Sequence, residues 1–348
     1  MGIPHRPPIL SRRVRASLCV LVMGLALQGC GLVVDAIQFI YPIATDELDT
    51  ICTRGQLHVG MAIEPRRPFV FPAIYTDEGL RVAGMDVELV REIAGALSRR
   101  CKNNQQITPV LNLVRFRDLF VQLNEGKLDL FVSGVSANIP ALGRDGLAYS
   151  TPYFYDGGIG GITHRPEVND RLRTQLHEKT EKPEGSALLK KILAGLTVAV
   201  QEGTSAQLYA EGHLSGVKLV VCDSLPAAFE SEDPAIDVIL SQQPVLQFMV
   251  TRVRKDWQQI LRETGKPLIL TREQYAVVMA EGNYRLRWFV NDLLFQLDDS
   301  GRLAKMRRRW LEEDYAFPRR AAAEGLPFDV KGMVTHYDQG TCRMQPGH

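Results

Sequence analysis

Two short polar segments carry residue types that could bind an anion or a small polar solute. The first, 203–205, reads Gly-Thr-Ser and lies between a predicted strand and a predicted helix. Backbone N–H groups and the dipole at a helix N-terminus favour an anion there, although Thr204 or Ser205 could serve only as a helix N-cap. The second segment ends a predicted buried strand, where open α/β sheets place ligand sites, and a simple turn is the alternative. Its candidate residues are Ser133, Gly134 and Ser136.

The sequence lacks the residue patterns that are typical of catalysis or metal binding. Its seven histidines fall on no recognisable catalytic motif, and there is no nucleophile elbow, P-loop or zinc-ligand spacing. An enzyme would need acid and base groups that converge in a cleft. We therefore expect a binding protein that is not an enzyme and that uses no cofactor and no metal.

The N-terminus is typical of an export signal that ends at a cysteine. Four arginines precede an apolar run, 16–27, which is too short to span a bilayer as a helix. The run ends in Leu27-Gln28-Gly29-Cys30, which resembles the lipobox of bacterial lipoprotein precursors. This implies a signal peptide over 1–29 and acylation of Cys30, with palmitate as a label, whereas a chance cysteine after an ordinary signal is the alternative. Residues 30–50 would form the lipidated tether and lead-in.

The composition of the mature chain argues against nucleic acid as a partner. Removing the signal peptide takes away four arginines and no acidic residue, which leaves 37 basic against 40 acidic side chains. A chain with this balance of charges has no overall positive potential that would attract nucleic acid. No later apolar stretch approaches 18 residues, so nothing else in the sequence is expected to cross a membrane.

Strands and helices alternate along the chain. The pattern predicts strands at 56–62 and 128–133 and a helix at 86–97. Helices between buried strands favour a parallel α/β sheet. The alternation restarts at 196–200, after a polar stretch at 165–190 that we interpret as an insertion or connector. The sequence therefore predicts a second α/β unit.

Four blocks, in order, resemble the amino-acid-type (family 3) substrate-binding proteins of ABC uptake systems, from about residue 48 to residue 310. They are 54–60 with 68–71, 84–89, 126–153, and 198–205 with 300–306. The resemblance implies a type II periplasmic binding protein fold, in which two α/β lobes joined by two crossing strands close on a ligand like a hinge. The implied domains are lobe 1 at 51–160 plus 275–315, lobe 2 at 163–272 with the insertion 165–190, and an irregular C-terminal tail at 316–348.

The resemblance also implies residues that contact the ligand between the lobes. Phe69 and Phe71 follow the first strand, where family members place an aromatic ring, with core packing as the better interpretation for at least one of them. The segment 133–136 would offer backbone and hydroxyl hydrogen bonds. Arg144 would grip an α-carboxylate through its guanidinium fork. Because its spacing to Tyr149 is one residue shorter than in the family, a surface charge is the alternative.

Gln242 is the main departure from the family pattern. Many members carry an aspartate at this position, and it pairs with the ammonium group of the ligand. A neutral amide cannot neutralise an ammonium, and burying an unpaired charge is costly. A carboxylate, a modified amino acid or another small polar solute is therefore as well supported as a standard α-amino acid. Arg66 and Arg67 would favour an anion, unless they are exposed surface residues.

Four cysteines remain when the signal peptide and the proposed anchor Cys30 are set aside. They are Cys52, Cys101, Cys222 and Cys342. An oxidising compartment allows three pairings of these four. We favour Cys52–Cys101, because it would join two segments of lobe 1. Four free buried thiols are the alternative.

Together these features predict a monomeric solute-binding lipoprotein on the periplasmic side of the cell envelope that delivers an amino acid or a carboxylate-like solute to an inner-membrane ABC permease. The residue after Cys30 is Gly31 and not an aspartate, which favours an anchor in the outer membrane if the host has two membranes. One alternative is a sensory or accessory lipoprotein that acts on a protein partner. The other is a dehydratase-type enzyme on the same fold.

Overall fold

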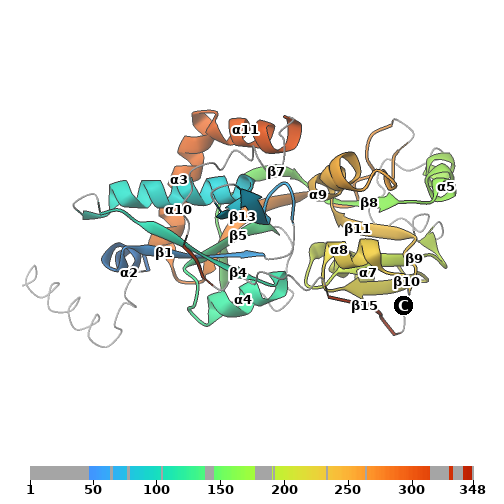
Figure 1. Cartoon of the computed structure of the whole chain (residues 1–348), viewed down its shortest axis with the longest axis horizontal. Helices are drawn as coiled ribbons and strands as arrows, with labels where there is room; N and C mark the ends of the chain where they lie inside the picture. The colour runs from blue at the N-terminus through green and yellow to red at the C-terminus, as the bar shows by residue number, and fades with distance from the viewer. Residues whose placement is uncertain are drawn as a thin grey trace, which may run out of the picture. The chain divides into compact units, whose positions relative to one another are not determined.

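Two β-sheets with packed helices organise the chain. The computed structural model describes residues 47–62, 66–76, 79–102, 105–137, 145–176, 190, 193–232, 234–262, 265–313, 329–331 and 340–346. The predicted signal peptide, Cys30 and Arg144 lie outside these residues. Each sheet belongs to one lobe (Figure 1), so the expected two-lobed α/β fold is confirmed.

The lobe 1 sheet has the strand order β14-β4-β1-β5-β13-β6, and β7 pairs with β13. β1 is parallel to β4 and β5, whereas β13 is antiparallel to β5, β6 and β7. The strands are β1 (Gln56–Ala62), β4 (Thr108–Val114), β5 (Leu130–Ser136), β6 (Leu147–Tyr149), β7 (Phe154–Gly157), β13 (Glu273–Ala280) and β14 (Asp329–Lys331). A separate hairpin joins β2 (Phe71–Thr76) to β3 (Gly79–Ala83). The helical elements are α2 (Glu47–Arg54), α3 (Met85–Arg100), α4 (Phe116–Asn124), α10 (Tyr284–Asp299), α11 (Arg302–Arg307) and η3 (Arg308–Glu312).

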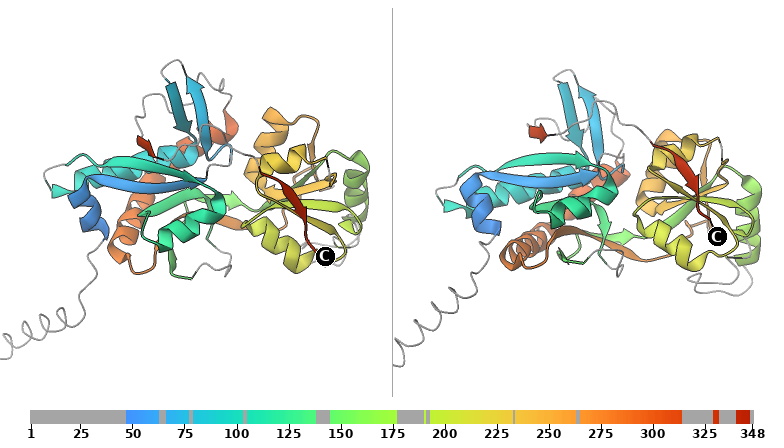
Figure 2. Two further views of the ribbon diagram at one scale, coloured as in Figure 1. Left: turned by 60° about the horizontal axis from the view of Figure 1, so that its bottom comes forward. Right: turned by 90° about the horizontal axis from the view of Figure 1, so that it is seen from below.

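The lobe 2 sheet has the order β12-β8-β11-β9-β10-β15. Its strands are β8 (Ile159–Thr163), β9 (Thr197–Gln201), β10 (Lys218–Cys222), β11 (Val238–Gln242), β12 (Gln258–Gln259) and β15 (Cys342–Met344). Its helical elements are α5 (Pro166–Leu176), α7 (Ser205–His213), α8 (Leu225–Glu230), α9 (Gln243–Phe248) and η2 (Met249–Val253). β9 is parallel to β10 and β11. Figure 2 shows the ribbon of both lobes from two further sides.

The central strand β5 shows why these segments form a sheet between two helical layers. All of its residues are buried. Leu130 and Val132 join the apolar cluster that contains α3, whereas Phe131 and Val135 join the cluster that contains α4. Successive side chains of a strand point to opposite faces. A strand covered on both faces therefore needs a continuous apolar run, as this sequence provides.

The chain passes between the lobes at Gly158 and again at residues 271–272, because β7 and β13 lie in one sheet and β8 in the other. Gly158 has a φ of 152°, and a side chain there would overlap the Thr271 carbonyl. Glycine alone tolerates this approach. Thr271 Oγ1 accepts a hydrogen bond from Ile159 N (3.0 Å), and Leu270 N donates one to Ile159 O (2.8 Å). The two crossings are therefore bonded to each other.

The C-terminal tail was expected to be irregular, and this prediction is wrong for both of its described segments. β14 adds a parallel strand beside β4, and β15 adds an antiparallel strand beside β10. Outer strands of a sheet leave a row of backbone groups that another strand can pair with. Three-residue strands whose partners lie more than a hundred residues away leave no local periodicity in the sequence, which is why the tail reads as irregular.

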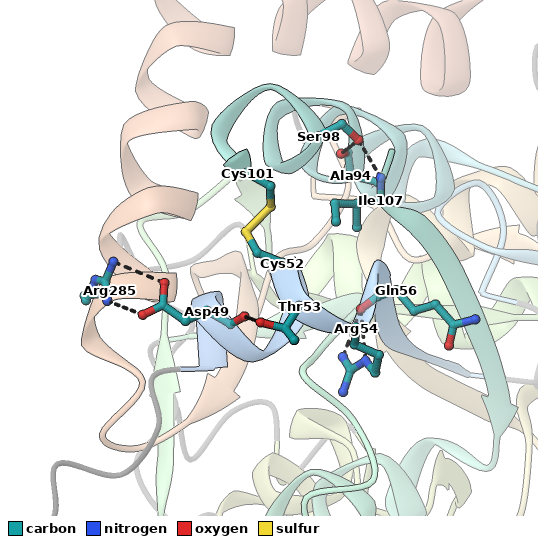
Figure 3. The surroundings of a disulfide bond; sticks show 10 residues. All are labelled: Asp49, Cys52, Thr53, Arg54, Gln56, Ala94, Ser98, Cys101, Ile107 and Arg285. Carbon is teal, nitrogen blue, oxygen red and sulfur yellow. Dashed lines mark hydrogen bonds and ion pairs between the residues drawn. A yellow bond between two sulfur atoms is a disulfide. The ribbon is translucent and has the colours of Figure 1, made fainter. Parts of the chain in front are cut away.

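Two disulfides tie distant segments together. Cys52–Cys101 joins α2 to the residue that follows α3 (Figure 3), and this is the pairing favoured from the sequence. Cys222–Cys342 joins β10 to β15 and so fixes the C-terminal strand to lobe 2. The second bond connects two strands that also pair with each other.

Two expected features lie partly outside the described residues. The predicted lead-in ran to residue 50, but α2 already begins at Glu47. The stretch 165–190 begins with α5, a helix of eleven residues. Among the described residues no helix is both long and apolar enough to cross a bilayer. The same residues contain no group of three His, Cys, Asp or Glu side chains that could hold a metal ion.

Candidate functional site

A tight turn after β1 points Arg66 toward lobe 2. Arg66 and Val70 form an isolated β-bridge, and the N–H of Phe69 donates to the Arg66 carbonyl (2.8 Å). This turn buries Phe69 in lobe 1 and leaves the Arg66 side chain 3% exposed. The alternative of an exposed surface arginine is therefore wrong for Arg66.

The Arg66 guanidinium binds two glutamine side chains at the carboxyl ends of lobe 2 strands. It donates to Gln242 Oε1 from one nitrogen and to Gln201 Oε1 (3.5 Å) from another. Its centre also lies 4.1 Å from the centroid of the Phe116 ring, at the start of α4. A cation over an aromatic face is stabilised by the ring quadrupole. The positive charge of lobe 1 is thus held by amide oxygens of lobe 2.

Gln242 completes a second bridge between the lobes. Its Nε2 donates to the carbonyl oxygen of Gly134 (2.7 Å), so one amide side chain binds lobe 1 at two points. Gly134 has a φ of 58°, which turns its peptide groups out of the regular strand pattern at the end of β5. Gln242 and Gly134, both predicted to contact ligand, therefore contact each other.

Asp86, in the first turn of α3, binds the backbone of Gly134 from inside lobe 1. Its carboxylate accepts hydrogen bonds from Gly134 N (2.8 Å) and from the Tyr153 hydroxyl (2.8 Å). Burial raises the pKa of Asp86 to about 7, while the bonds from Tyr153 and Gly134 and the charge of Arg66 oppose this rise. Burial and the neighbouring Asp86 also raise the pKa of Tyr153.

The two predicted serines lie in the same buried region. Ser133 Oγ accepts a hydrogen bond from Ala62 N (2.9 Å), which joins the ends of β5 and β1. Ser136 is 3% exposed at the end of β5. Ser133 therefore has a clear structural role, and both serines lie on β5, the strand that contains Gly134.

The two predicted aromatic residues are packed in the interior. Phe69 makes edge-on contacts with Phe154 and Tyr275, with centroids 5.3 Å apart in both cases. Phe71 packs against Phe248 (5.6 Å), which belongs to lobe 2, and Trp310 (5.7 Å). Core packing, the alternative raised for these residues, describes both rings.

The Gly-Thr-Ser segment forms a third contact between the lobes. Thr204 caps α7, because its side chain accepts a hydrogen bond from Gln207 N (3.4 Å). Ser205 Oγ instead donates to Glu273 Oε2 (3.0 Å) at the start of β13. Glu273 is 1% exposed and also accepts a bond from Thr271 Oγ1 (3.1 Å). Thr204 therefore fits the N-cap alternative, while Ser205 reaches across to lobe 1.

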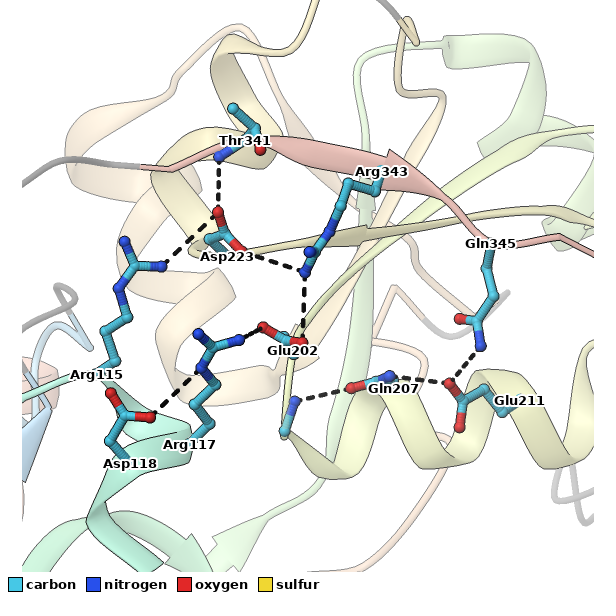
Figure 4. Close-up of polar contacts among 11 residues, drawn as sticks. Arg115, Arg117, Asp118, Glu202, Gln207, Glu211, Asp223, Thr341, Arg343 and Gln345 are labelled. Carbon is cyan, nitrogen blue, oxygen red and sulfur yellow. Dashed lines mark hydrogen bonds and ion pairs between the residues drawn. The ribbon is translucent and has the colours of Figure 1, made fainter. Parts of the chain in front are cut away.

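An ion-pair network borders this contact on the side of α4 (Figure 4). Arg117 Nη1 lies 2.6 Å from Glu202 Oε2, and Arg115 lies 3.8 Å from Asp223. Arg343, in β15, bonds to both of these lobe 2 carboxylates. The Glu202 charge raises the pKa of Arg117. These side chains are partly exposed, so each pair is expected to contribute only modestly to stability.

A cavity of about 490 Å³ lies elsewhere between the lobes. Its lining residues from lobe 1 are Pro68, Trp310, Leu311 and Glu312, and those from lobe 2 are Pro244, Gln247, Phe248, Thr251 and Arg252. None of the predicted site residues lines it. The predicted residues Gly134 and Gln242 instead lie in the hydrogen-bonded contact with Arg66.

Sequence reasoning missed three residues that organise this contact: Asp86, Gln201 and Glu273. Asp86 stands in the Gly-Met-Asp block that resembles the family, which is the signal that could have found it. Gln201 likewise stands in the block 198–205, whereas Glu273 carries no local signal, because its importance depends on how the two sheets meet. Arg144 lies outside the described residues.

Comparisons with known proteins show similarity to one family and to a known fold. Residues 61–214 match the model of the bacterial extracellular solute-binding proteins, family 3. The amino-acid-binding protein AabA of Dichelobacter nodosus is 23% identical over 243 residues, which are 70% of this chain and 85% of that protein. The matched segment includes the last two residues of β1, the Asp86 block, β5 with Gly134, and α7.

Solved structures show a similar fold. A crystal structure of the P235GK mutant of ArgBP from T. maritima has a TM-score of 0.58 and 26% identity, and the match covers 77% of this chain and all of that one. The ancestral amino-acid-binding protein AncCDT-1, described as a precursor of cyclohexadienyl dehydratase, is similar in fold, with a TM-score of 0.58, 21% identity and the same coverage. Over residues 61–214 the chain is thus similar to the bacterial extracellular solute-binding proteins, family 3, and its two-lobed fold agrees with that similarity.

Proposed function

We propose that this protein is an exported, monomeric lipoprotein that captures a small carboxylate-bearing solute between its lobes and delivers it to an ABC permease. The anchor is Cys30, and the protein acts by binding and not by catalysis. The observation that carries the choice of ligand is the buried Arg66 guanidinium, which lies between the lobes and contacts Gln242.

The charges around this contact favour an anion. Gln242 occupies the position where many family members carry an aspartate for the ammonium of the ligand, and the amide is neutral. Arg66 adds a positive charge at the same place. Two like charges 4 Å apart repel by about 4 kcal/mol at an effective dielectric constant of 20. An ammonium beside Arg66 would therefore be disfavoured, and a carboxylate would be favoured.

A carboxylate can replace the present partners of Arg66 at a net gain. Hydrogen bonds between ionised partners contribute roughly twice as much as neutral ones. The planar guanidinium also matches a carboxylate in a bidentate geometry. On closure, Gln201 and Gln242 would then hold the polar remainder of the solute instead of the Arg66 side chain.

The test is a thermal-shift screen of the purified protein against monocarboxylates, dicarboxylates, amino acids and sugars. A solute at a hundredfold its Kd should stabilise the fold by about 2.7 kcal/mol. We expect carboxylates to give the largest shifts and Arg66→Gln to abolish them. Arg67→Gln is the matched control. Arg67 is the next residue in the chain, but its guanidinium carbon lies over the Phe71 ring, 5.5 Å from the ring centroid. Equal carboxylate binding by Arg66→Gln, or no shift with any solute, would refute the proposal.

A further inference from the structure

One face of α10 exposes three aromatic side chains to solvent. Tyr284, Trp288 and Phe295 are 56%, 67% and 71% exposed. Trp288 follows Tyr284 by four residues, and Phe295 follows Trp288 by seven. At 3.6 residues per turn, the three side chains therefore fall within about 40° of one another around the helix. The opposite face carries the buried leucines of lobe 1. This aromatic face of α10, defined as Tyr284, Trp288 and Phe295, is thus separate from the helix's packing face.

The chain enters the fold beside this aromatic face. α2, the first described element, packs against α10, and Asp49 Oδ2 lies 2.8 Å from Arg285 Nη1 (Figure 3). Glu47 is only 17 residues after Cys30, and an extended chain of that length reaches at most about 60 Å. An anchor at Cys30 would therefore keep α2 within about 60 Å of the bilayer.

The charges at this end complement an anionic surface. The disulfide Cys52–Cys101 brings the end of α3 against α2, and the exposed side chains there include Arg99, Arg100 and Lys102. Each cationic side chain close to an anionic leaflet adds about 1 kcal/mol of attraction. The acidic residues of α10 lie in its C-terminal half, at Asp292, Asp298 and Asp299. The end that bears Tyr284 and Trp288 is thus the more basic one.

We propose that the aromatic face of α10 docks on the surface of the lipid bilayer. Tryptophan and tyrosine favour the headgroup region, where the ring is desolvated and the polar edge stays hydrated. Docking holds lobe 1 against the membrane and leaves lobe 2 to move about the crossings at Gly158. The inference rests on the proposed tether at Cys30, but its contact residues belong only to α10.

Trp288 is itself a reporter for this contact. The sequence has three tryptophans, and the other two, Trp257 and Trp310, are 7% and 1% exposed. The full chain is bound to vesicles of phosphatidylethanolamine and phosphatidylglycerol, with or without bromine on the acyl chains, which quenches tryptophan on contact. We expect brominated lipid to lower the emission at least twofold. Trp288→Phe should remove the quenching, whereas the matched control Trp257→Phe should retain it.

A second pair of variants tests the rest of the face with Trp288 left in place. Tyr284→Ser with Phe295→Ser should halve the quenching or more, whereas Tyr155→Ser, which removes an exposed ring on β7, should leave it unchanged. Equal emission with and without bromine in vesicle-bound protein would overturn the inference. So would a blue shift of Trp288 that grows with protein concentration in the absence of lipid, because a second copy would then cover the face. Solute-induced thermal shifts of Trp288→Phe test the proposed function separately.

Discussion

Replacing Gln242 with alanine should open the ligand-free protein. Gln242 accepts a charged hydrogen bond from Arg66 and donates a neutral one to the Gly134 carbonyl, and both partners belong to lobe 1. A hydrogen bond to a charged group contributes about 1.5–3 kcal/mol and a neutral one about 0.5–1.5 kcal/mol. Their loss should shift the equilibrium between closed and open forms by about 2–4 kcal/mol, which is roughly 30- to 1,000-fold.

Pulsed electron paramagnetic resonance can measure this opening as a distance between the lobes. Spin labels at Val121→Cys in lobe 1 and Val253→Cys in lobe 2 use positions that are 55% and 43% exposed, so labelling should not disturb the core. Gln242→Ala should lengthen the main distance in the absence of solute. Gln258→Ala is the control, because it removes an exposed glutamine from β12 of lobe 2 and touches neither the bridge nor the cavity between the lobes. If Gln242→Ala and the parent protein give the same distance distribution, this bridge does not hold the lobes together.

Three further predictions concern pH, the disulfide in lobe 1 and the anchor. Burial raises the pKa of Asp86 from 3.8 to about 7, so the folded protein keeps a proton that the unfolded chain releases. The free energy of unfolding should therefore fall between pH 4 and pH 7 by up to about 1.4 kcal/mol per pH unit. Urea unfolding of Asp86→Asn should show a clearly flatter dependence of this free energy on pH. Replacing Cys52 and Cys101 together by serine should lower the free energy of unfolding by about 2–4 kcal/mol, because a loop of 49 residues is no longer closed in the unfolded state; an unchanged urea midpoint would contradict this. Cys30→Ser should abolish metabolic labelling with palmitate, and labelling that persists would exclude Cys30 as the anchor.

Periodicity and turn residues predicted most of the fold because local sequence determines them. The strand at 56–62 is β1 in full, and the apolar run at 128–133 overlaps β5, where Leu130 and Phe131 face different helical layers. The two strands of the C-terminal tail could not be predicted in this way. Their pairing partners, β4 and β10, are remote in the sequence, and each strand has only three residues.

The candidate site was only partly predictable, for a related reason. The sequence placed Gly134, Ser205 and Gln242 at the ends of strands or helices, and all three make contacts between the lobes. It could not show that Arg66 fills the space among them. A pair of adjacent arginines in a loop is usually exposed. The burial of Arg66 arises only because the turn at residues 66–70 aims it at lobe 2, whose position depends on the whole fold.

The contact with Arg66 gives a physical reason for a neutral residue at position 242. An aspartate at position 242 would form a buried ion pair with Arg66, and breaking such a pair costs about 3–5 kcal/mol because one charge is left uncompensated. A solute would then have to overcome that cost before it could enter. The amide of Gln242 still accepts a hydrogen bond from the guanidinium, but this bond is weaker than an ion pair, and a carboxylate could replace it. Under the proposed function, the neutral residue at this position would therefore allow one arginine both to join the lobes and to bind an anionic solute.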